Sequence, residues 1–152
     1  MNGQIVNDSI GRFVADAAIR KMIEVGPAPK KSKVVILGLT FKENCPDIRN
    51  SKVDDIIKRL SEYGIEPIVV DPWANQQDTR REYGIELAEM SEVKDADCVL
   101  VTVAHDIFKN MPLQKIKELY KEVPDCEKVL IDVKGIYNIT ELKQSGISYW
   151  RL

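Results

Sequence analysis

The stretch that decides the fold is KVVILGLTFKENCPDIRNSKVDDIIKRL, residues 33–60. It begins with a short apolar run that passes through Gly38, and it ends with apolar residues repeated at the spacing of one helix face. A buried strand, a turn and a helix in this order open nucleotide-binding α/β folds. This turn is unusual because it carries Lys42, Asp47 and Arg49 where such folds place further glycines.

The same alternation continues along the chain. We expect strands at residues 34–37, 67–70, 85–87, 98–103, 129–132 and 148–150, and helices at residues 53–63, 112–123 and 140–143. Continuous apolar strands separated by helices are typical of a parallel sheet whose two faces are both covered. The sequence therefore predicts the α/β class, with a doubly wound, mainly parallel Rossmann-like sheet of about six strands and helices on both faces.

One more amphipathic helix is expected at residues 7–24, ahead of a segment rich in glycine and proline that ends it. Three residues are candidates for its N-cap: Asn7, Asp8 and Ser9. The helix after the opening turn is expected to begin at the N-cap Ser51, with Asp54 completing a capping box, and to end before Gly64. The chain is thus divided into an N-terminal helix (1–25), a linker (26–32) and an α/β domain (33–152).

Composition limits the function. With 152 residues the chain is long enough to bury a core without a metal or disulfide. A net charge of -2 argues against a generic nucleic-acid or membrane-surface binder. Three cysteines without C-x-x-C spacing favour a reducing, cytoplasmic compartment, and the sequence shows neither a signal peptide nor an apolar run long enough to span a membrane.

Candidate ligand-binding residues follow two of the expected strands. Ligands of open α/β sheets bind beyond the carboxyl ends of the strands, where Lys42, Arg49 and Lys134 are expected. Because no G-x-x-G follows Gly38, the backbone cannot close on a pyrophosphate in the usual way, and cationic side chains are expected to bind the anion instead.

A simpler alternative is that these cations only form exposed surface pairs. Lys42 would then pair with Glu43, and Arg49 with Asp47, and neither pair would contribute much to stability. Spacing alone leaves the two interpretations even. Lys134, a further cation expected at the same edge, favours ligand binding.

Other residues of this edge are given structural roles. Asp71 ends the second strand but lies too far from Gly38 for the ribose-binding acid of a dinucleotide fold, so we expect it to cap a helix or a turn. His105 stands beside Asp106, yet no convincing nucleophile accompanies the pair, and a structural role is favoured. Cys45 and Trp73 are expected to pack rather than react or bind.

Four segments carry a resemblance to a known family. ILGLTFKENCPDIRNSKVDDII, GIEPIVVDPWA, VLVTVAHDIF and LIDVKGIYN resemble the C-terminal, UDP-binding domain of the UDP-glucose/GDP-mannose dehydrogenase superfamily, in particular the UDP-N-acetylhexosamine 6-dehydrogenases of polysaccharide synthesis. The motif F-K-x-x-x-x-D-x-R-x-S is specific and the others are supporting. Residues 1–25 resemble the end of the central helix that joins the two halves of those enzymes.

The resemblance implies a role in oxidising a UDP-hexose or UDP-N-acetylhexosamine to a uronic acid with NAD. It implies that Phe41 and Lys42 contact the nucleotide sugar, that Lys134 lies near the substrate, and that Arg49 reaches NAD bound by an N-terminal half of the enzyme. Many relatives have arginine at the position of Lys134, so that match is weaker. A homo-oligomer is also expected, because the N-terminal helix presents an apolar stripe.

The sequence departs from the family in one respect. It contains no G-x-G-x-x-G and no glycine-rich catalytic cysteine segment, and Cys45 belongs to the substrate-domain turn. We therefore expect a fragment or truncated reading frame that is inactive alone and has no catalytic residue of its own. The sequence is also compatible with two other classes: a free-standing, non-catalytic nucleotide-binding or regulatory module, and a phosphorylation receiver domain. The receiver is disfavoured because Gly38, Leu39 and Thr40 replace its paired acids.

Overall fold

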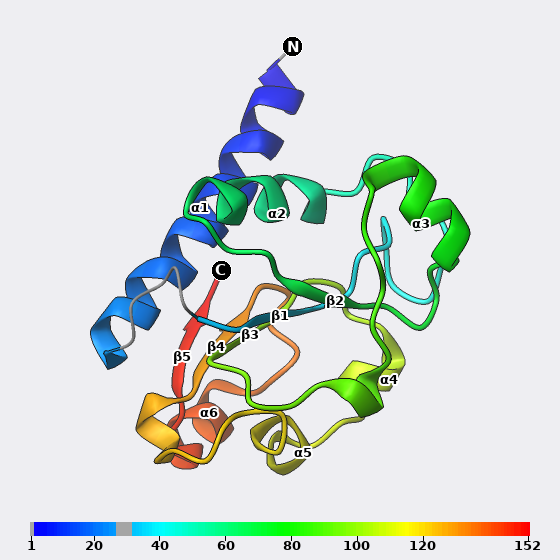
Figure 1. Ribbon diagram of the computed structural model, residues 1–152. Helices are drawn as coiled ribbons and strands as arrows, with labels where there is room; N and C mark the ends of the chain where they lie inside the picture. Colours follow the sequence, from blue (N-terminus) through cyan, green and yellow to red (C-terminus); the bar gives the residue numbers. More distant parts are fainter. Residues whose placement is uncertain (1, 27–31) are drawn as a thin grey trace.

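The structure, a computed structural model, describes residues 2–26 and 32–152 (Figure 1). Side chains are described from Ile10 onward. Its centre is a sheet of five parallel strands in the order β2-β1-β3-β4-β5. The strands are β1 (Val34–Leu37), β2 (Ile68–Val70), β3 (Cys98–Val101), β4 (Val129–Asp132) and β5 (Ser148–Arg151). The predicted α/β class and parallel sheet are confirmed, with one strand fewer than expected.

From β1 the chain continues to β2 on one side, and the later strands β3, β4 and β5 all lie on the other side of β1. Leu37, the last residue of β1, pairs with Val70 of β2 on one side and with Val101 of β3 on the other. β1 therefore lies at the topological switch point, and the carboxyl ends of β1 and β3 form the place where ligands of such sheets bind.

Helices cover both faces of the sheet (Figure 1). They are α1 (Asn2–Val25), α2 (Val53–Glu62), α3 (Gln76–Tyr83), α4 (Asp106–Lys109), α5 (Leu113–Lys117) and α6 (Ile139–Ser145), with short 3-10 turns η2 (Met90–Glu92) and η3 (Asp125–Glu127). α1 and α2 bury their apolar residues in one core with β1, β3 and β4. Side chains of α4, α5 and α6 fill a second core on the opposite face.

The N-terminal helix packs on the sheet domain. Arg59 of α2 donates from Nε to Asp16 of α1 at 2.9 Å, and its guanidinium lies 5.4 Å from the centre of the Tyr63 ring. Three apolar side chains of α1 are not buried: Ile10, Phe13 and Ile23 are 42%, 50% and 58% exposed. Within the described residues, no helix is both long and apolar enough to cross a bilayer.

Several predicted boundaries were wrong. α1 begins at Asn2, so the three proposed N-cap residues lie inside the helix. Residues 85–87 form only one bridge, between Leu87 and Val69, and the strand expected at 98–103 ends at Val101. The helix expected at 112–123 ends at Lys117 because Tyr120 forms a bridge with Ala96. Most of the expected linker, residues 27–31, lies outside the described residues.

Two helices were not expected, α3 and α4. The sequence of α3, QQDTRREY, buries only Thr79 and so has no apolar stripe to announce it. Its ends are nevertheless well defined. The side chain of Asn75 accepts the N–H of Asp78 at 2.9 Å, and Gly84 closes the helix in the left-handed conformation.

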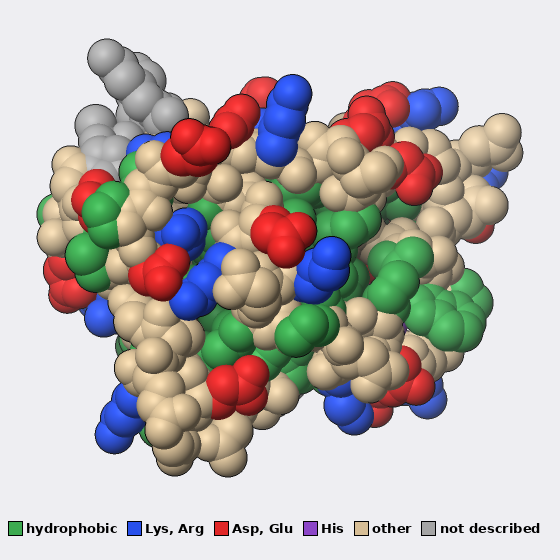
Figure 2. Space-filling view, turned by 90° about the horizontal axis from the view of Figure 1, so that it is seen from below, with side chains coloured by type: hydrophobic (Ala, Val, Ile, Leu, Met, Phe, Trp, Pro, Cys, Tyr) green, Lys and Arg blue, Asp and Glu red, His purple; other side chains and the backbone are tan. Residues whose placement is uncertain are grey.

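The face formed by α5 and α6 shows acidic and basic side chains interspersed, with apolar surface between them (Figure 2). This distribution agrees with the net charge of -2. A field of a single sign does not extend over this face, so charge alone would not attract a polyanion to it.

Candidate functional site

Gly38 brings the ends of β1 and β3 together. Its φ of 113° is a left-handed value, and a Cβ built on it would lie 2.6 Å from the Cβ of Val103 and 2.8 Å from the Val103 backbone nitrogen. A side chain therefore has neither the space nor the backbone conformation that it needs. This glycine serves close packing of two strand ends, whereas the glycines of a dinucleotide fingerprint admit a pyrophosphate.

Asp71, at the end of β2, binds the start of the loop formed by residues 38–50, which we name the β1 loop. Its Oδ2 accepts the N–H of Leu39 at 2.6 Å and of Thr40 at 2.9 Å, and its Oδ1 accepts the N–H of Trp73 at 2.8 Å. Burial tends to raise the pKa of Asp71, but the hydrogen bonds from His105, Leu39 and Thr40 outweigh it and hold this pKa below its ordinary value. The expected capping role is confirmed.

His105 joins Asp71 to the middle of the β1 loop. It is fully buried; its Nε2 lies 3.0 Å from Asp71 Oδ2, and its Nδ1 accepts the N–H of Asn44 at 2.9 Å. Asn44 Oδ1 in turn accepts the N–H of Asp106 at 3.0 Å. The partner of His105 is thus Asp71 rather than the adjacent Asp106, and the expected structural role holds. The partnership spans 34 residues and could not be read from sequence.

The end of the β1 loop is held equally well. Ser51 donates its hydroxyl to the carbonyl of Leu39 at 2.5 Å and accepts the N–H of Val53 at 3.2 Å. The hydroxyl of Tyr83 donates to the carbonyl of Ile48 and accepts the N–H of Ser51. Ser51 therefore does cap α2 from one residue before the formal cap position. Asp54 forms an ion pair with Lys58, in place of the expected capping box.

Three predicted ligand residues of the loop face solvent. Phe41 is 51% exposed, Lys42 is exposed, and the Arg49 side chain is 79% exposed. Arg49 forms a two-point ion pair with Asp47, at 3.0 Å and 3.2 Å, which raises the pKa of Arg49 and lowers that of Asp47. Arg49 and Asp47 thus form the exposed pair that the simpler alternative names. Among the described residues, Lys42 forms no ion pair, so the pair expected with Glu43 is absent.

The predicted residues line separate hollows. Arg49 borders one of about 240 Å³ together with Asp47, Asp78, Arg81 and other residues of the β1 loop and α3. The exposed Lys134 borders another, of about 260 Å³, between α1, α2 and the ends of β3 and β4. Neither of these two hollows is lined by Phe41 or Lys42. Arg49 and Lys134 therefore border two different hollows.

The switch-point crevice does not fit a dinucleotide. Thr40, Asn44 and His105 fill it with a hydrogen-bonded cluster, and all of the Asp71 hydrogen bonds go to the protein itself. Cys45 is half-buried and Trp73 is 44% exposed, with its ring 6.3 Å from that of His105. The outer surface of the β1 loop, where Phe41 and Lys42 are exposed, remains open to a ligand at this edge. Such a surface can form one side of a shared site.

Comparisons with known proteins point to one family. A family model described as "UDP-glucose/GDP-mannose dehydrogenase family, UDP binding domain" matches residues 35–139, which include all four predicted ligand residues. A UDP-N-acetyl-D-glucosamine 6-dehydrogenase of Salmonella typhi is 41% identical over 136 residues, which are 88% of this chain and 31% of that protein.

Two solved structures are similar. The UDP-N-acetyl-mannosamine dehydrogenase Cap5O from Staphylococcus aureus matches with a TM-score of 0.68 at 26% identity, covering 98% of this chain and 32% of the other. The NDP-N-acetyl-D-galactosaminuronic acid dehydrogenase of Methanosarcina mazei Go1 has a TM-score of 0.83 at 21% identity, with 96% and 30% covered, and so shows the fold. The chain spans about a third of the length of these relatives.

Proposed function

This chain belongs to the UDP-glucose/GDP-mannose dehydrogenase family, and we propose that it serves as the UDP-sugar-binding domain of an NAD-dependent nucleotide-sugar 6-dehydrogenase. Such an enzyme oxidises a UDP-hexose or UDP-N-acetylhexosamine to the uronic acid. The chain itself supplies recognition of the nucleotide sugar. It is inactive by itself, because the crevice of its sheet does not fit NAD and its sequence has no glycine-rich catalytic cysteine segment.

The observation that carries this proposal is the construction of the β1 loop. Asp71 and His105 fix its backbone, while Lys42 faces solvent and forms no ion pair among the described residues. An ammonium group on a fixed loop is well suited to a diphosphate, because little of the binding energy is spent on ordering the loop. Phe41 beside it offers an exposed ring for contact with the nucleotide sugar.

Arg49 and Lys134 have the remaining roles. We assign Arg49 to NAD carried by a second, N-terminal domain, and its exposed pair with Asp47 would exchange for a pair with the cofactor phosphate. We assign Lys134 a position near the substrate. It follows Asp132, the last residue of β4, by two residues. Self-association through α1 is supported by the exposure of Phe13 and Ile23 on that helix.

A free-standing nucleotide-binding or regulatory module is the second candidate. The observation that favours it is that α1 shares one hydrophobic core with α2 and the sheet, so this helix is already packed within the chain. Adding a separately produced N-terminal half from a relative distinguishes the two. Restored oxidation of a UDP-sugar supports the dehydrogenase domain, and UDP binding without restored activity supports the module.

The experiment that tests the proposed function is calorimetric titration of the chain with UDP, a UDP-N-acetylhexosamine and NAD separately. We expect the uridine nucleotides to bind and NAD to bind weakly or not at all. ADP serves as the control for the base. Equal affinities for UDP and ADP, or binding of NAD alone, would contradict the assignment.

A further inference from the structure

We propose that His105 is a positioning residue for nucleotide binding: its ring fixes the turn of the β1 loop that carries Phe41 and Lys42. This inference rests on the proposed function, since it concerns the same loop. His105 follows β3 and lies opposite the β1 loop. The two segments are 65 residues apart in the sequence where Thr40 and His105 meet.

The hydrogen bonds define the tautomer of the imidazole. Nδ1 accepts the backbone N–H of Asn44 at 2.9 Å, so it cannot carry a proton itself. The proton is therefore on Nε2, which lies 3.0 Å from Asp71 Oδ2 and 3.2 Å from Thr40 Oγ1 and donates toward both. A carboxylate that orients one ring nitrogen leaves the other free to accept, which is the usual way a neighbouring acid selects a tautomer.

The ring binds both ends of one short turn. Thr40 and Asn44 flank Phe41, Lys42 and Glu43, and the Thr40 hydroxyl donates to the carbonyl of Lys42 at 3.0 Å. Asn44 adopts a left-handed φ of 53°, so the backbone reverses sharply there. The two hydrogen-bonded ends leave the Lys42 backbone little freedom, while its side chain is exposed to solvent.

The surroundings of His105 make these hydrogen bonds strong. The ring is fully buried, with the Phe108 ring 5.5 Å away and the Trp73 ring 6.3 Å away. A buried imidazole that loses a partner cannot turn to water instead, so the loss is costly. Replacing the ring should therefore release the turn locally and move Lys42.

Two substitutions separate the functions of the two ring nitrogens. His105→Asn puts a carbonyl oxygen near the position of Nδ1, where it can accept the N–H of Asn44. His105→Gln puts an amide NH₂ near the position of Nε2, where it can donate to Asp71, and it leaves Asn44 without an acceptor. Tyr120→Phe is the matched control, because it removes a buried hydrogen bond to the carbonyl of Val129, in the core on the opposite side of the sheet from α1 and α2.

We expect UDP affinity to fall about tenfold in H105Q, by less than about threefold in H105N, and not at all in Y120F, although all three variants melt at a lower temperature. The imidazole ¹⁵N shifts of the wild-type chain should show the Nε2–H tautomer. Affinities that fall in both His105 variants in proportion to their melting temperatures, or that do not change in H105Q, would overturn the positioning role.

Amide hydrogen exchange at Asn44 keeps this test independent of the proposed function. The amide should be protected in the wild-type chain and in H105N, and should exchange fast in H105Q. If the wild-type chain binds no UDP, the proposed function fails, and the exchange pattern alone supports or overturns the fixing of the turn. Fast exchange of Asn44 in the wild-type chain would overturn it.

Discussion

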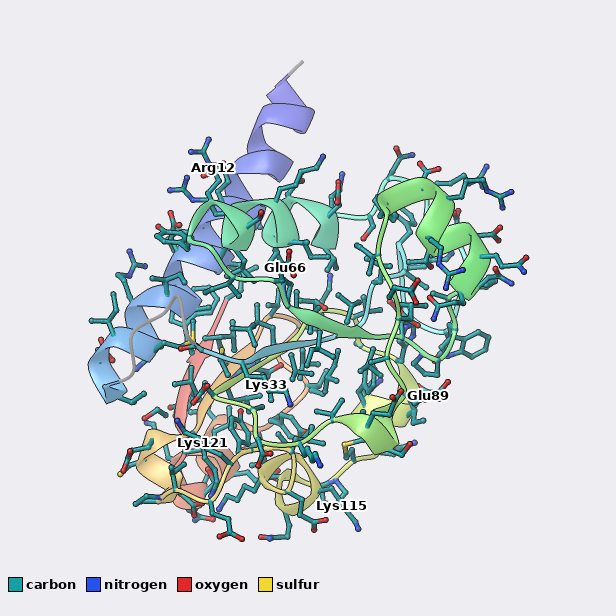
Figure 3. All side chains as sticks on the ribbon, in the orientation of Figure 1. Arg12, Lys33, Glu66, Glu89, Lys115 and Lys121 are labelled. Carbon is teal, nitrogen blue, oxygen red and sulfur yellow. The ribbon has the colours of Figure 1, made fainter. Side chains whose placement is uncertain are left out.

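Carboxylates near the amino ends of the strands and those near the carboxyl ends are stabilised by different donors. We call these two sides of the sheet the amino edge and the carboxyl edge. At the amino edge, Asp97 accepts the N–H of Lys33 at 2.8 Å and pairs with the ammonium of Lys121, and both lysines lie on that side of the sheet (Figure 3). Asp125, just before β4, likewise binds two lysine ammonium groups, at 2.9 Å and 2.8 Å. Lysines at this edge are thus used within the fold.

At the carboxyl edge, the acids are satisfied mainly by N–H donors. Asp71 binds backbone N–H groups and His105, and Asp132 accepts the N–H of Ile136 and of Tyr137, both at 3.0 Å. Arg151 approaches Asp132 only to 3.9 Å. Because these acids need no lysine, Lys42 and Lys134 keep their charges available, and neither forms an ion pair within the part of the chain that the structure describes.

The largest effect on stability should come from adding a methyl group at Gly38, where the ends of β1 and β3 meet. Gly38→Ala is expected to destabilise the chain by about 3 kcal/mol, because the left-handed backbone and the contact with Val103 both oppose a side chain. Gly84→Ala is the control, with φ of 69° and no atom within 4 Å of the added Cβ, and it should cost about 1 kcal/mol. Urea unfolding measures both. Equal losses would mean that the two strand ends are not tightly packed.

A smaller effect is expected at Asp71. Asp71→Asn should lower the free energy of unfolding by about 2 kcal/mol at neutral pH. The amide NH₂ of asparagine cannot accept a hydrogen bond, so it would face the backbone N–H donors without a partner. The folded-state pKa of Asp71 is depressed, so its contribution is present above the unfolded pKa of about 4 and is lost as pH falls below it through the folded value. Unfolding free energies of the wild type and the variant should therefore converge in acid. A difference that stays constant from pH 7 to pH 2 would contradict this.

Much of the architecture follows from local patterns, and the site network does not. The apolar runs at β1, β3 and β4 predicted their strands well, since each is buried along its whole length. The partnership of Asp71 with His105 depends on β2 and β3 lying on opposite sides of β1, with ends in register. No spacing rule in the sequence contains that information.

The contacts of α3 show a second limit of prediction from sequence. The side chain of Gln76 donates to the carbonyl of Leu87 at 3.0 Å and accepts the N–H of the same residue at 2.8 Å. This two-point contact holds residue 87 near the sheet edge, and residues 85–87 consequently form a single bridge instead of the predicted strand. Tertiary contacts of this kind override propensity, and an apolar pattern alone cannot reveal them.

A third prediction concerns the helix that follows the β1 loop. Ser51→Ala should destabilise the chain by about 1.5 kcal/mol, because this hydroxyl both caps α2 and donates to Leu39. Asn75→Ala, which removes the exposed cap of α3, should cost about 1 kcal/mol or less. Thermal melts followed by circular dichroism compare them. A greater loss in the Asn75 variant would show that the β1 loop is less firmly held than its contacts indicate.

The central prediction is that Lys42, at the carboxyl edge, binds the nucleotide. The most direct measurement is calorimetric titration with UDP of two variants matched in charge, Lys42→Ala at the carboxyl edge and Lys121→Ala at the amino edge. Loss of one charged contact to a phosphate should lower affinity about tenfold in the Lys42 variant and leave the Lys121 variant unchanged. Equal affinities in both variants, or a loss confined to the Lys121 variant, would contradict the assignment of the β1 loop to UDP binding.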